Sequence, residues 1–531
     1  MRIGTIIDRR GLSHRLDLAC LAEGLSDEGT PVWLVDGLDQ SHLRSIVESN
    51  RLEGLVVAAR DEARVYSLAG NALHEAGADR FALMAVNLHD LCAHVHPCKE
   101  ATEKARLLLS AAVAMLREYR PPHRANIRLG VARPNGRLSR RALLTMPRLR
   151  YELIPAVDET LCASSRGCNL CSAVCPAGAV SIDAGAAYIL KQACRNCGLC
   201  LTACPVGAIS HPWYRRRVVD AGLRALLAQD EAAFARKIVA FACPGAVGVL
   251  QEAGRQRLSY SPAILPWQVP CAGFVDWYLV LRAFDLGAAA VALLGCAEGC
   301  RHRCTPEAAT GRFQAISRLS DALGLGSARL QVLSEDSAPA LVSRMNAFAK
   351  NVASLPWPIS AEATPTAAEV HRYQVAPLLI ALCRRLGISD DPSLEDEEVP
   401  FGAATIDSTK CSLCGLCAAR CPTRALSHVV IGEEARLLFT AQECIGCRLC
   451  APPCPENALY IRRRLDLASL RAETQTLKTA QVVRCRRCGQ PFASEAMVSR
   501  VSLRLGNRLP TAVANHCPDC RMVADPVRPG S

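Results

Sequence analysis

The sequence predicts a multidomain protein of mixed α/β and α+β class. The chain has 531 residues, which is too long for one hydrophobic core. Two stretches alternate short apolar runs with amphipathic helical patterns, as α/β domains do. Sixteen of the 29 cysteines fall into four closely spaced runs that each end in Cys-Pro. These runs come in two pairs and mark two further modules.

Residues 1–125 form the first predicted domain, a small α/β unit. Its expected strands are the short apolar runs at 3–7, 32–35 and 55–58. Its expected helices are the amphipathic stretches at 42–49 and 65–76, followed by a long helix at 101–119. This order is the βαβ pattern of a parallel sheet. A polar segment at 120–150 then leads to the first cysteine module.

The cysteine modules are predicted at 151–215 and 403–465. Their spacing is Cys-x2-Cys-x2-Cys-x3-Cys-Pro, in which three cysteines hold one [4Fe–4S] cluster and the fourth holds its neighbour. In the second module this groups Cys411, Cys414 and Cys417 with Cys454, and Cys444, Cys447 and Cys450 with Cys421. In the first it groups Cys162, Cys168 and Cys171 with Cys204, and Cys194, Cys197 and Cys200 with Cys175. We therefore expect two ferredoxin-like modules with four [4Fe–4S] clusters.

The first run departs from this spacing. Five residues, Ala-Ser-Ser-Arg-Gly, separate Cys162 from Cys168 where two are usual. The insertion is small and contains glycine, so a bulged loop could still deliver Cys162 to its cluster. A wider loop would also change the N–H···S bonding and solvent access of that cluster, and both influence its potential.

The cysteine pattern also bears on the cellular compartment of the protein and on the interpretation of its net charge. Such regular, close thiols fit metal ligation in a reducing cytosol better than a secreted disulfide scaffold, so we expect a cytoplasmic protein. No apolar run is long enough for a membrane span, and the N-terminus resembles a strand rather than a signal peptide. The formal charge of +12 is balanced by about −12 when the four [4Fe–4S] clusters are counted together with one [2Fe–2S] cluster and one zinc, which are predicted for later segments below. We therefore do not expect nucleic-acid binding.

The segment 216–345 is predicted to be a second α/β domain, with strands at 238–242 and 289–294. It contains Phe241-Ala-Cys-Pro, Val269-Pro-Cys-Ala-Gly-Phe-Val-Asp276 and Leu294-Gly-Cys-Ala-Glu-Gly-Cys300. These motifs resemble the delta subunit of methyl-viologen-reducing hydrogenase. The resemblance implies one [2Fe–2S] cluster, with ligands drawn from Cys243, Cys271, Cys296 and Cys300 and with Cys304 as a substitute. It also implies a link from a hydrogenase or formate dehydrogenase to heterodisulfide reductase.

The N-terminal domain resembles that of HdrA, the heterodisulfide reductase chain whose next domain binds FAD. The motifs are Arg2-Ile-Gly-Thr-Ile-Ile-Asp-Arg-Arg-Gly11 and Val86-Asn-Leu-His-Asp-Leu-Cys-Ala-His-Val-His96. That family places cluster cysteines where this chain has Asp8, Arg10 and Arg60. These side chains cannot replace soft thiolates, so we expect a domain without a cluster that serves for packing or docking. No flavin fingerprint follows, so a flavin would belong to a separate subunit.

The remaining segments are a linker at 346–402, with one helix near 375–386, and a tail at 466–531. The tail carries two C-x2-C knuckles, Cys485/Cys488 and Cys517/Cys520. Four thiolates in this arrangement suit one structural zinc in a ribbon-like fold, with a mononuclear iron as the alternative. The alternation at 501–505 predicts a strand between the knuckles. The isolated Cys20 and Cys383 are expected in the core.

Together these features favour an electron-transfer subunit of a soluble oxidoreductase complex. It would relay electrons between a hydrogenase- or formate-dehydrogenase-type partner and a heterodisulfide-reductase-like unit. One alternative is a self-contained reductase whose substrate binds at an irregular cluster, either near Cys162 or at the set Cys296, Cys300 and Cys304. Another is a redox sensor whose zinc ribbon contacts nucleic acid.

Overall fold

The computed structural model describes residues 1–12, 14–131, 149–228, 234, 236–295, 305–356, 375–388, 392–506 and 508–524. The spatial contacts between residues divide the chain into two compact units. Unit 1 comprises 1–162, 170–183 and 187–389, and unit 2 comprises 163–169, 184–186 and 390–531. Within the described ranges, no helix is both long enough and apolar enough to cross a membrane.

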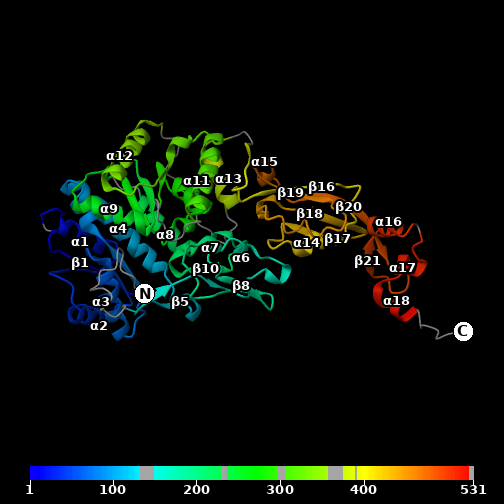
Figure 1. Ribbon diagram of the computed structural model, residues 1–531, viewed down its shortest axis with the longest axis horizontal. Helices are drawn as coiled ribbons and strands as arrows, with labels where there is room; N and C mark the ends of the chain where they lie inside the picture. The colour runs from blue at the N-terminus through cyan, green and yellow to red at the C-terminus, as the bar shows by residue number, and fades with distance from the viewer. Residues whose placement is uncertain are drawn as a thin grey trace. The chain divides into compact units, whose positions relative to one another are not determined.

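Unit 1 begins with a four-stranded parallel sheet in the order β2-β1-β3-β4, drawn in blue in Figure 1. Its strands are β1 (Ile3–Asp8), β2 (Val32–Val35), β3 (Gly54–Ala58) and β4 (Leu83–Val86). Its helices are α1 (Leu18–Asp27), α2 (Gln40–Asn50) and α3 (Glu62–Glu75). Every residue of β1 and β3 is buried, as expected for central strands covered on both faces. The predicted βαβ pattern is confirmed.

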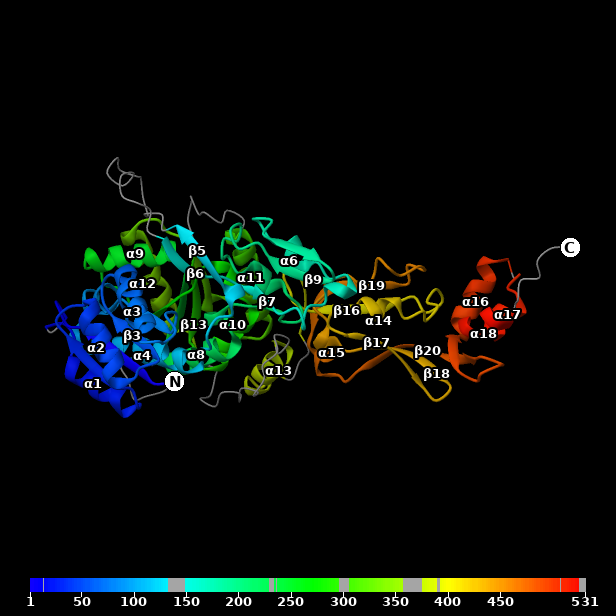
Figure 2. The same ribbon diagram turned by 90° about the horizontal axis from the view of Figure 1, so that it is seen from below.

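A long helix, α4 (Cys98–Glu118), joins this sheet to the rest of unit 1. It follows a short π-helix, η1 (His89–Ala93). One side of α4 packs on α1 and β3, and another packs along α8 (Arg216–Leu227), as Figure 2 shows. Because α4 has neighbours on several sides, most of its residues are buried.

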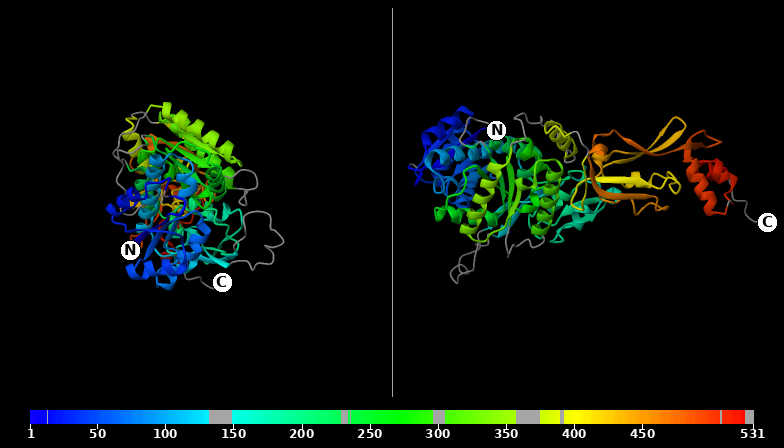
Figure 3. Two further views of the ribbon diagram at one scale, coloured as in Figure 1. Left: turned by 90° about the vertical axis from the view of Figure 1, so that its left-hand side faces the viewer. Right: turned by 90° about the horizontal axis from the view of Figure 1, so that it is seen from above.

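The central domain is a second parallel sheet, in the order β12-β11-β13-β14. Its strands are β11 (Ile238–Ala242), β12 (Ile264–Gln268), β13 (Ala290–Leu294) and β14 (Leu330–Leu333). Its helices are α9 (Pro244–Arg255), α10 (Trp277–Asp285), α11 (Thr305–Ala322) and α12 (Ala338–Ser354). Figure 3 shows this green sheet with helices packed around it. The strands predicted in this segment are confirmed.

The helix predicted in the linker is α13 (Val375–Arg385), and it packs on α10. Its last residue, Arg385, donates to both a side-chain oxygen and the carbonyl oxygen of Asp285 at 2.6 Å. Asp285 is fully buried and also pairs with Arg282. A buried carboxylate with two guanidinium partners anchors α13 to the central domain.

The first cysteine module lies mainly in unit 1 and consists of short elements. Two antiparallel pairs are present, β7 (Ala156–Val157) with β10 (Ile209–Ser210), and β8 (Val180–Asp183) with β9 (Ala186–Ile189). A third pair, β5 (Ile127–Val131) with β6 (Leu149–Leu153), precedes them. The helical turns are η2 (Arg124–Asn126), η3 (Ser164–Arg166), α6 (Leu170–Ala173), α7 (Leu199–Ala203) and η4 (Pro212–Tyr214).

Unit 2 contains the second cysteine module and the tail. One sheet has the order β15-β19-β16, with β15 (Ser393–Glu395), β16 (Gly402–Ile406) and β19 (Leu459–Asp466). The other has the order β17-β18-β20-β21, with β17 (Leu426–Ile431), β18 (Glu434–Phe439), β20 (Gln475–Arg484) and β21 (Pro491–Ser494). The helical elements are α14 (Leu416–Arg420), η7 (Ala441–Glu443), α15 (Leu467–Arg471), α16 (Glu495–Arg504), α17 (Thr511–Asn515) and α18 (Pro518–Ala524). The second sheet therefore runs from the cysteine module into the tail.

Two details of the predicted fold are wrong. The stretch at 501–505, expected as a strand, belongs to α16 and its C-cap. The hydroxyl of Ser494 caps this helix by accepting the N–H of Met497, and a cap of this kind favours a helix over the alternating pattern. Cys20, expected in the core, is exposed on α1. The apolar contacts of that helix are made by Leu21 and Leu25 instead, whereas Cys383 is buried as expected.

Candidate iron–sulfur and metal centres

Two hollows in the second module are each lined by four cysteines. Site III is the hollow lined by Cys411, Cys414, Cys417 and Cys454. Site IV is the hollow lined by Cys421, Cys444, Cys447 and Cys450. Each combines three cysteines of one run with the Cys-Pro cysteine of the other. This is the crossed grouping that the sequence pattern predicts, and four convergent thiols fit a [4Fe–4S] core.

The backbone around these cysteines repeats the same turns. In all four runs the residue before the second cysteine is left-handed, namely Gly167, Asn196, Leu413 and Gly446. In three of the runs the residue after the second cysteine is left-handed as well, namely Gly198, Gly415 and Arg448. In all four runs the third residue after the Cys-Pro cysteine is left-handed, namely Gly178, Gly207, Arg424 and Asn457. The four runs thus share one local scaffold.

These turns aim backbone N–H groups at the cysteine sulfurs. The N–H of Leu413 donates to Cys411 Sγ and that of Asn196 to Cys194 Sγ, both at 3.4 Å. Past the Cys-Pro cysteines, Ala179 N–H donates to Cys175 Sγ at 3.2 Å. Ala458 N–H does the same to Cys454 Sγ at 3.4 Å. Such N–H···S bonds stabilise thiolates and tune cluster potentials.

Without a bound metal, burial disfavours ionisation of the cysteine thiols. It raises the pKa of Cys417 and of Cys444 to about 12, and the pKa of Cys171 to about 11. At neutral pH these groups would stay protonated without a positive charge beside them. An iron–sulfur core supplies that charge, because iron binds the deprotonated sulfur. The electrostatics of the cysteine sets therefore fit metal ligation.

Five of the eight cysteines of the first module lie in or against one hydrophobic core. Cys171, Cys200 and Cys204 belong to this core with Val180 and Ile209, and Cys162 and Cys175 pack against it. Site I is our name for the predicted set Cys162, Cys168, Cys171 and Cys204, and site II for Cys175, Cys194, Cys197 and Cys200. Because members of both sets share one core, sites I and II are neighbours, which suits electron transfer between them.

The loop before Cys162 has a counterpart in the second module. Asp158 Oδ1 accepts the N–H and the hydroxyl of Thr160, and Asp407 Oδ1 accepts the same two groups of Thr409. The sequences are Asp-x-Thr-x-Cys in both cases. This short repeat is visible in the sequence, although the cysteine spacing alone does not point to it. It places Cys162 in the same local setting as Cys411, and the insertion comes only after it.

Two of the central cysteines lie at one edge of the parallel sheet. Cys243 directly follows β11, Cys271 lies three residues after β12, and both are buried. The N–H of Cys243 donates to the carbonyl of Leu294, the last residue of β13. Carboxyl ends of parallel strands form the usual ligand-binding edge of such a sheet. Cys296, Cys300 and Cys304 lie outside the described residues.

The central domain and the first module share a small hydrophobic cluster. It consists of Cys197, Leu199, Cys271 and Phe274. Phe274 lies so close to Gly198 that a Cβ on this glycine would be 2.4 Å from the phenyl ring. Arg312 bridges the same contact, because it donates to the carbonyl of Val275 and to Thr202 Oγ1. Site II therefore lies against the cysteine-bearing edge of the central sheet.

The N-terminal domain has ion pairs at the positions where the resemblance expects cluster cysteines. Arg10 pairs with Asp8 at 2.7 Å, and Arg60 pairs with the buried Asp90 at 3.4 Å. Guanidinium groups paired with carboxylates offer no soft donor for iron–sulfur ligation. The side chains present here do not fit a cluster.

A buried polar cluster that no sequence pattern predicts joins the N-terminal domain to the central domain. Lys104 on α4 is fully buried, and its Nζ lies 3.0 Å from His96 Nε2 and 3.0 Å from the Tyr260 hydroxyl. Burial lowers the pKa of Lys104 to about 7 and that of His96 to about 2. The nearby Cys92 is buried too, and burial raises its pKa to about 12. Only the long-range contacts identify this cluster.

The tail thiols form a compact four-ligand set. The sulfurs of Cys485, Cys488, Cys517 and Cys520 all lie within 4.8 Å of one another. Among the described residues this is the one group of three or more donors that meets this criterion. Burial opposes ionisation of Cys485, but N–H groups of Cys517, Cys488 and Arg487 bond its sulfur and lower its pKa to about 6. The set fits one tetrahedral ion with four thiolates.

Comparison with known proteins identifies three segments. Residues 238–356 match the family described as methyl-viologen-reducing hydrogenase, delta subunit. Residues 162–211 and 404–461 each match a 4Fe-4S dicluster domain. The resemblance of the central segment and the iron–sulfur character of both modules are thereby confirmed. The N-terminal resemblance stays a prediction.

Curated relatives match the central segment. The F420-non-reducing hydrogenase vhu iron-sulfur subunit of Methanocaldococcus jannaschii is 32% identical over 130 residues, which are 24% of this chain and 97% of the relative. The Methanococcus maripaludis protein with the same description is 35% identical over 102 residues, which are 18% of this chain and 72% of the relative. The Methanococcus voltae protein is 31% identical over 102 residues, with the same shares.

Proposed function

The chain belongs, through its central segment, to the methyl-viologen-reducing hydrogenase delta-subunit family, and on this premise we propose its place in an electron-transfer complex. The chain is an iron–sulfur electron-transfer protein related to hydrogenase iron–sulfur subunits. In our proposal it relays electrons between a hydrogenase- or formate-dehydrogenase-type partner and a heterodisulfide-reductase-like unit. A flavin, where the complex has one, belongs to another subunit, and the complex is cytoplasmic.

The observation that carries this proposal is the hydrophobic cluster that Cys197 and Cys271 share with Leu199 and Phe274. Of these residues, Cys197 is a predicted ligand of site II and Cys271 a predicted ligand of the central domain. Electron transfer slows steeply with distance, so a relay needs its centres packed against one another. The dry, aromatic contact at Phe274 also excludes water from the junction.

The proposed cofactors follow the thiol sets. Sites I to IV hold one [4Fe–4S] cluster each, and the tail holds one zinc, with a mononuclear iron as the alternative. Cys243 and Cys271 contribute to one [2Fe–2S] cluster with Cys296 and Cys300, or with Cys304 as substitute. These groups supply one-electron chemistry when bound. The chain supplies the thiolates, the N–H groups that face them and the hydrophobic surroundings.

The N-terminal domain is proposed to be a cluster-free relative of the N-terminal domain of HdrA. Its ion pairs at Asp8 and Arg60 replace the ligands that such a domain would need. Its long helix α4 packs on α8 and so joins it to the central domain. We propose that its role is packing within unit 1 or docking to another protein of the complex.

A reductive titration tests the relay. Reduced viologen is added anaerobically to the purified full-length chain, and its oxidation is followed. A relay takes up a fixed number of electrons and then stops, because the chain alone has no terminal acceptor. Continued viologen oxidation by the chain with a small-molecule acceptor would instead identify a self-contained reductase.

A variant pair tests the route. Cys197→Ser alters site II, and Cys447→Ser makes the equivalent change at site IV. We expect Cys197→Ser to slow reduction of the central centre, measured by freeze-quench EPR, whereas Cys447→Ser leaves that rate unchanged when electrons enter at the first module. Equal rates in both variants would contradict the proposed route.

A further inference from the structure

The tail metal set is built directly onto the sheet of the second module. β20 pairs with β18 of that module, and Cys485 follows the last residue of β20. The chain turns through Cys488 and Gly489 and returns as β21, which pairs with β20. The second knuckle closes against this hairpin, because the N–H of Arg486 donates to the carbonyl of Asn515. An ion in this set would therefore fix the end of a sheet that belongs to the cluster module.

Two side chains of the tail bind the backbone of the site III loop. Lys478 on β20 donates from Nζ to the carbonyls of Ser408 and Cys411, at 2.5 and 2.6 Å. Ser494, at the end of β21, donates from its buried hydroxyl to the carbonyl of Ser412 at 3.0 Å. These bonds hold the segment that presents the first ligand of site III.

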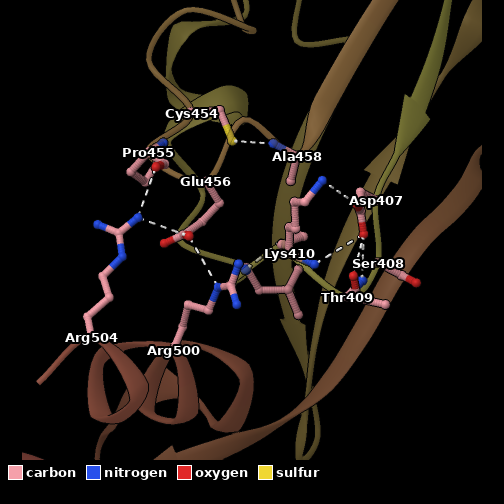
Figure 4. A network of polar contacts seen from close by, with 12 residues as sticks. Asp407, Ser408, Thr409, Lys410, Cys454, Pro455, Glu456, Ala458, Arg500 and Arg504 are labelled. Atoms are coloured by element: carbon pink, nitrogen blue, oxygen red, sulfur yellow. Dashed lines mark hydrogen bonds and ion pairs between the residues drawn. The ribbon is translucent and has the colours of Figure 1, made fainter. Parts of the chain in front are cut away.

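A third contact reaches the hollow of site III itself. Glu456 lines this hollow, and its side chain is only 9% exposed. Its Oε2 accepts Arg500 Nε at 3.1 Å and Arg504 Nη2 at 3.0 Å, as Figure 4 shows. Arg504 also donates to the carbonyl of Pro455, next to the ligand Cys454. Both arginines lie on α16, the helix that follows β21.

We propose that the tail is a metal-braced clamp that sets the redox potential of site III, with Arg500 and Arg504 as its positioning residues. This inference rests on the proposed function, because it requires a [4Fe–4S] cluster at site III. The braced hairpin carries α16, and α16 holds the two guanidinium groups over Glu456. These groups act through the Glu456 carboxylate and the Pro455 carbonyl, to which they donate.

The direction of the effect follows from charge. A nearly buried carboxylate beside four thiolates adds negative charge to the cluster environment and favours the oxidised cluster. Two guanidinium groups compensate that charge and favour the reduced cluster. Arg500 is 31% exposed and Arg504 is 59% exposed. Solvent screens the second more strongly, so Arg500 has the larger effect.

Potentiometric EPR titration of the full-length chain tests the clamp. Cys414→Ser and Cys447→Ser first assign the signals of sites III and IV. We expect Arg500→Gln to shift the site III potential to more negative values, Arg504→Gln to shift it less, and the double variant to shift it most. The site IV potential stays unchanged in all three. Arg508→Gln is the control, because Arg508 is an exposed arginine of the same tail.

A second measurement examines the metal. Cys485→Ala removes one tail ligand, whereas Ser494→Ala removes the bond to Ser412 and the N-cap of α16 while leaving all four thiols. We expect both to move the site III potential in the direction of the Arg500 variant, and only Cys485→Ala to lose the tail metal. An unchanged site III potential in the arginine double variant and in Ser494→Ala overturns the clamp. Absence of any site III signal in the unaltered chain overturns the proposed function itself.

Discussion

The contact between Gly198 and Phe274 offers a test of the junction between the first cysteine module and the central domain. Gly198 has φ +80°, and a Cβ there would lie 2.4 Å from Cδ2 and 2.6 Å from Cγ of Phe274. The phenyl ring of Phe274 cannot move away from an added methyl group, because neighbouring side chains enclose it. It is 2% exposed and contacts the rings of Tyr214 and His211 at centroid distances of 4.7 and 5.5 Å.

The destabilisation expected for Gly198→Ala has two parts. A left-handed backbone costs an alanine about 1 kcal/mol relative to glycine. Forcing a methyl group into a packed core costs a further 1–3 kcal/mol, roughly. Gly415→Ala is the matched control, because Gly415 occupies the same place in its cysteine run. Its φ is +73°, and its nearest neighbouring atom, His428 Cγ, is 3.4 Å from an added Cβ.

The difference between the destabilisations of the two variants measures the contribution of the Phe274 contact. We expect Gly198→Ala to lower the free energy of unfolding by about 2–4 kcal/mol and Gly415→Ala by about 1 kcal/mol. Anaerobic urea unfolding, followed by the visible absorption of the clusters, measures both. In the fourth run the same place is taken by Arg448, at φ +64°, so a side chain there is compatible with the ligand loop. Equal losses in the two variants would refute the tight contact at Phe274.

Three further predictions concern other parts of the chain. The folded-state pKa of Lys104, about 7, is lower than its ordinary value of 10.5 because of burial. The folded protein therefore binds fewer protons than the unfolded chain between these pH values, and stability rises with pH across that window by up to about 1.4 kcal/mol per unit. Lys104→Met should remove this part of the pH dependence, as measured by urea unfolding from pH 7 to 10.5. Arg385→Ala should cost about 1–3 kcal/mol because it takes one of two partners from the buried Asp285. The exposed Arg384→Ala should stay within about 0.5 kcal/mol in the same thermal unfolding measurement. Finally, metal analysis should give about 18 iron atoms per chain and about 14 for Cys162→Ala, which offers no donor atom, and an unchanged iron content in this variant would contradict the assignment of Cys162 as a ligand.

Parallel strands were the most predictable part of the fold. The strand at 238–242 was predicted to the residue, because a central strand covered on both faces is a continuous apolar run. The edge strand at 32–35 was also predicted to the residue, from its short apolar run alone. The segment at 501–505 was predicted wrongly, because Val501 and Leu505 also continue the four-residue helical spacing that begins at Met497. A capping hydroxyl at Ser494 decided between the two patterns. Caps of this kind are visible in sequence, but they compete with the periodicity signal.

The thiol groupings could be predicted because cluster ligation fixes the spacing along the chain. The contacts between different thiol sets could not be predicted from the sequence. Cys197 and Cys271 are far apart in sequence, as are Glu456 and Arg500, and no local pattern records which loops will meet. The buried Lys104 illustrates the same limit, because its partner Tyr260 comes from another domain. The spacing of the cysteines along the chain thus indicates which thiols belong to one set, whereas tertiary packing determines which sets lie close to one another.

The insertion in the first run shows how a ligand loop can lengthen without losing its ends. Before it, the Asp158 turn holds the approach to Cys162 as the Asp407 turn holds the approach to Cys411. After it, Gly167 is left-handed, and its N–H donates to the carbonyl of Ser164 at 2.8 Å. The extra residues therefore form one 3-10 turn that returns the chain toward Cys168. A local excursion of this kind alters the solvent and N–H groups near site I more than its thiols. We therefore expect its potential, rather than its ligand set, to distinguish site I from site III.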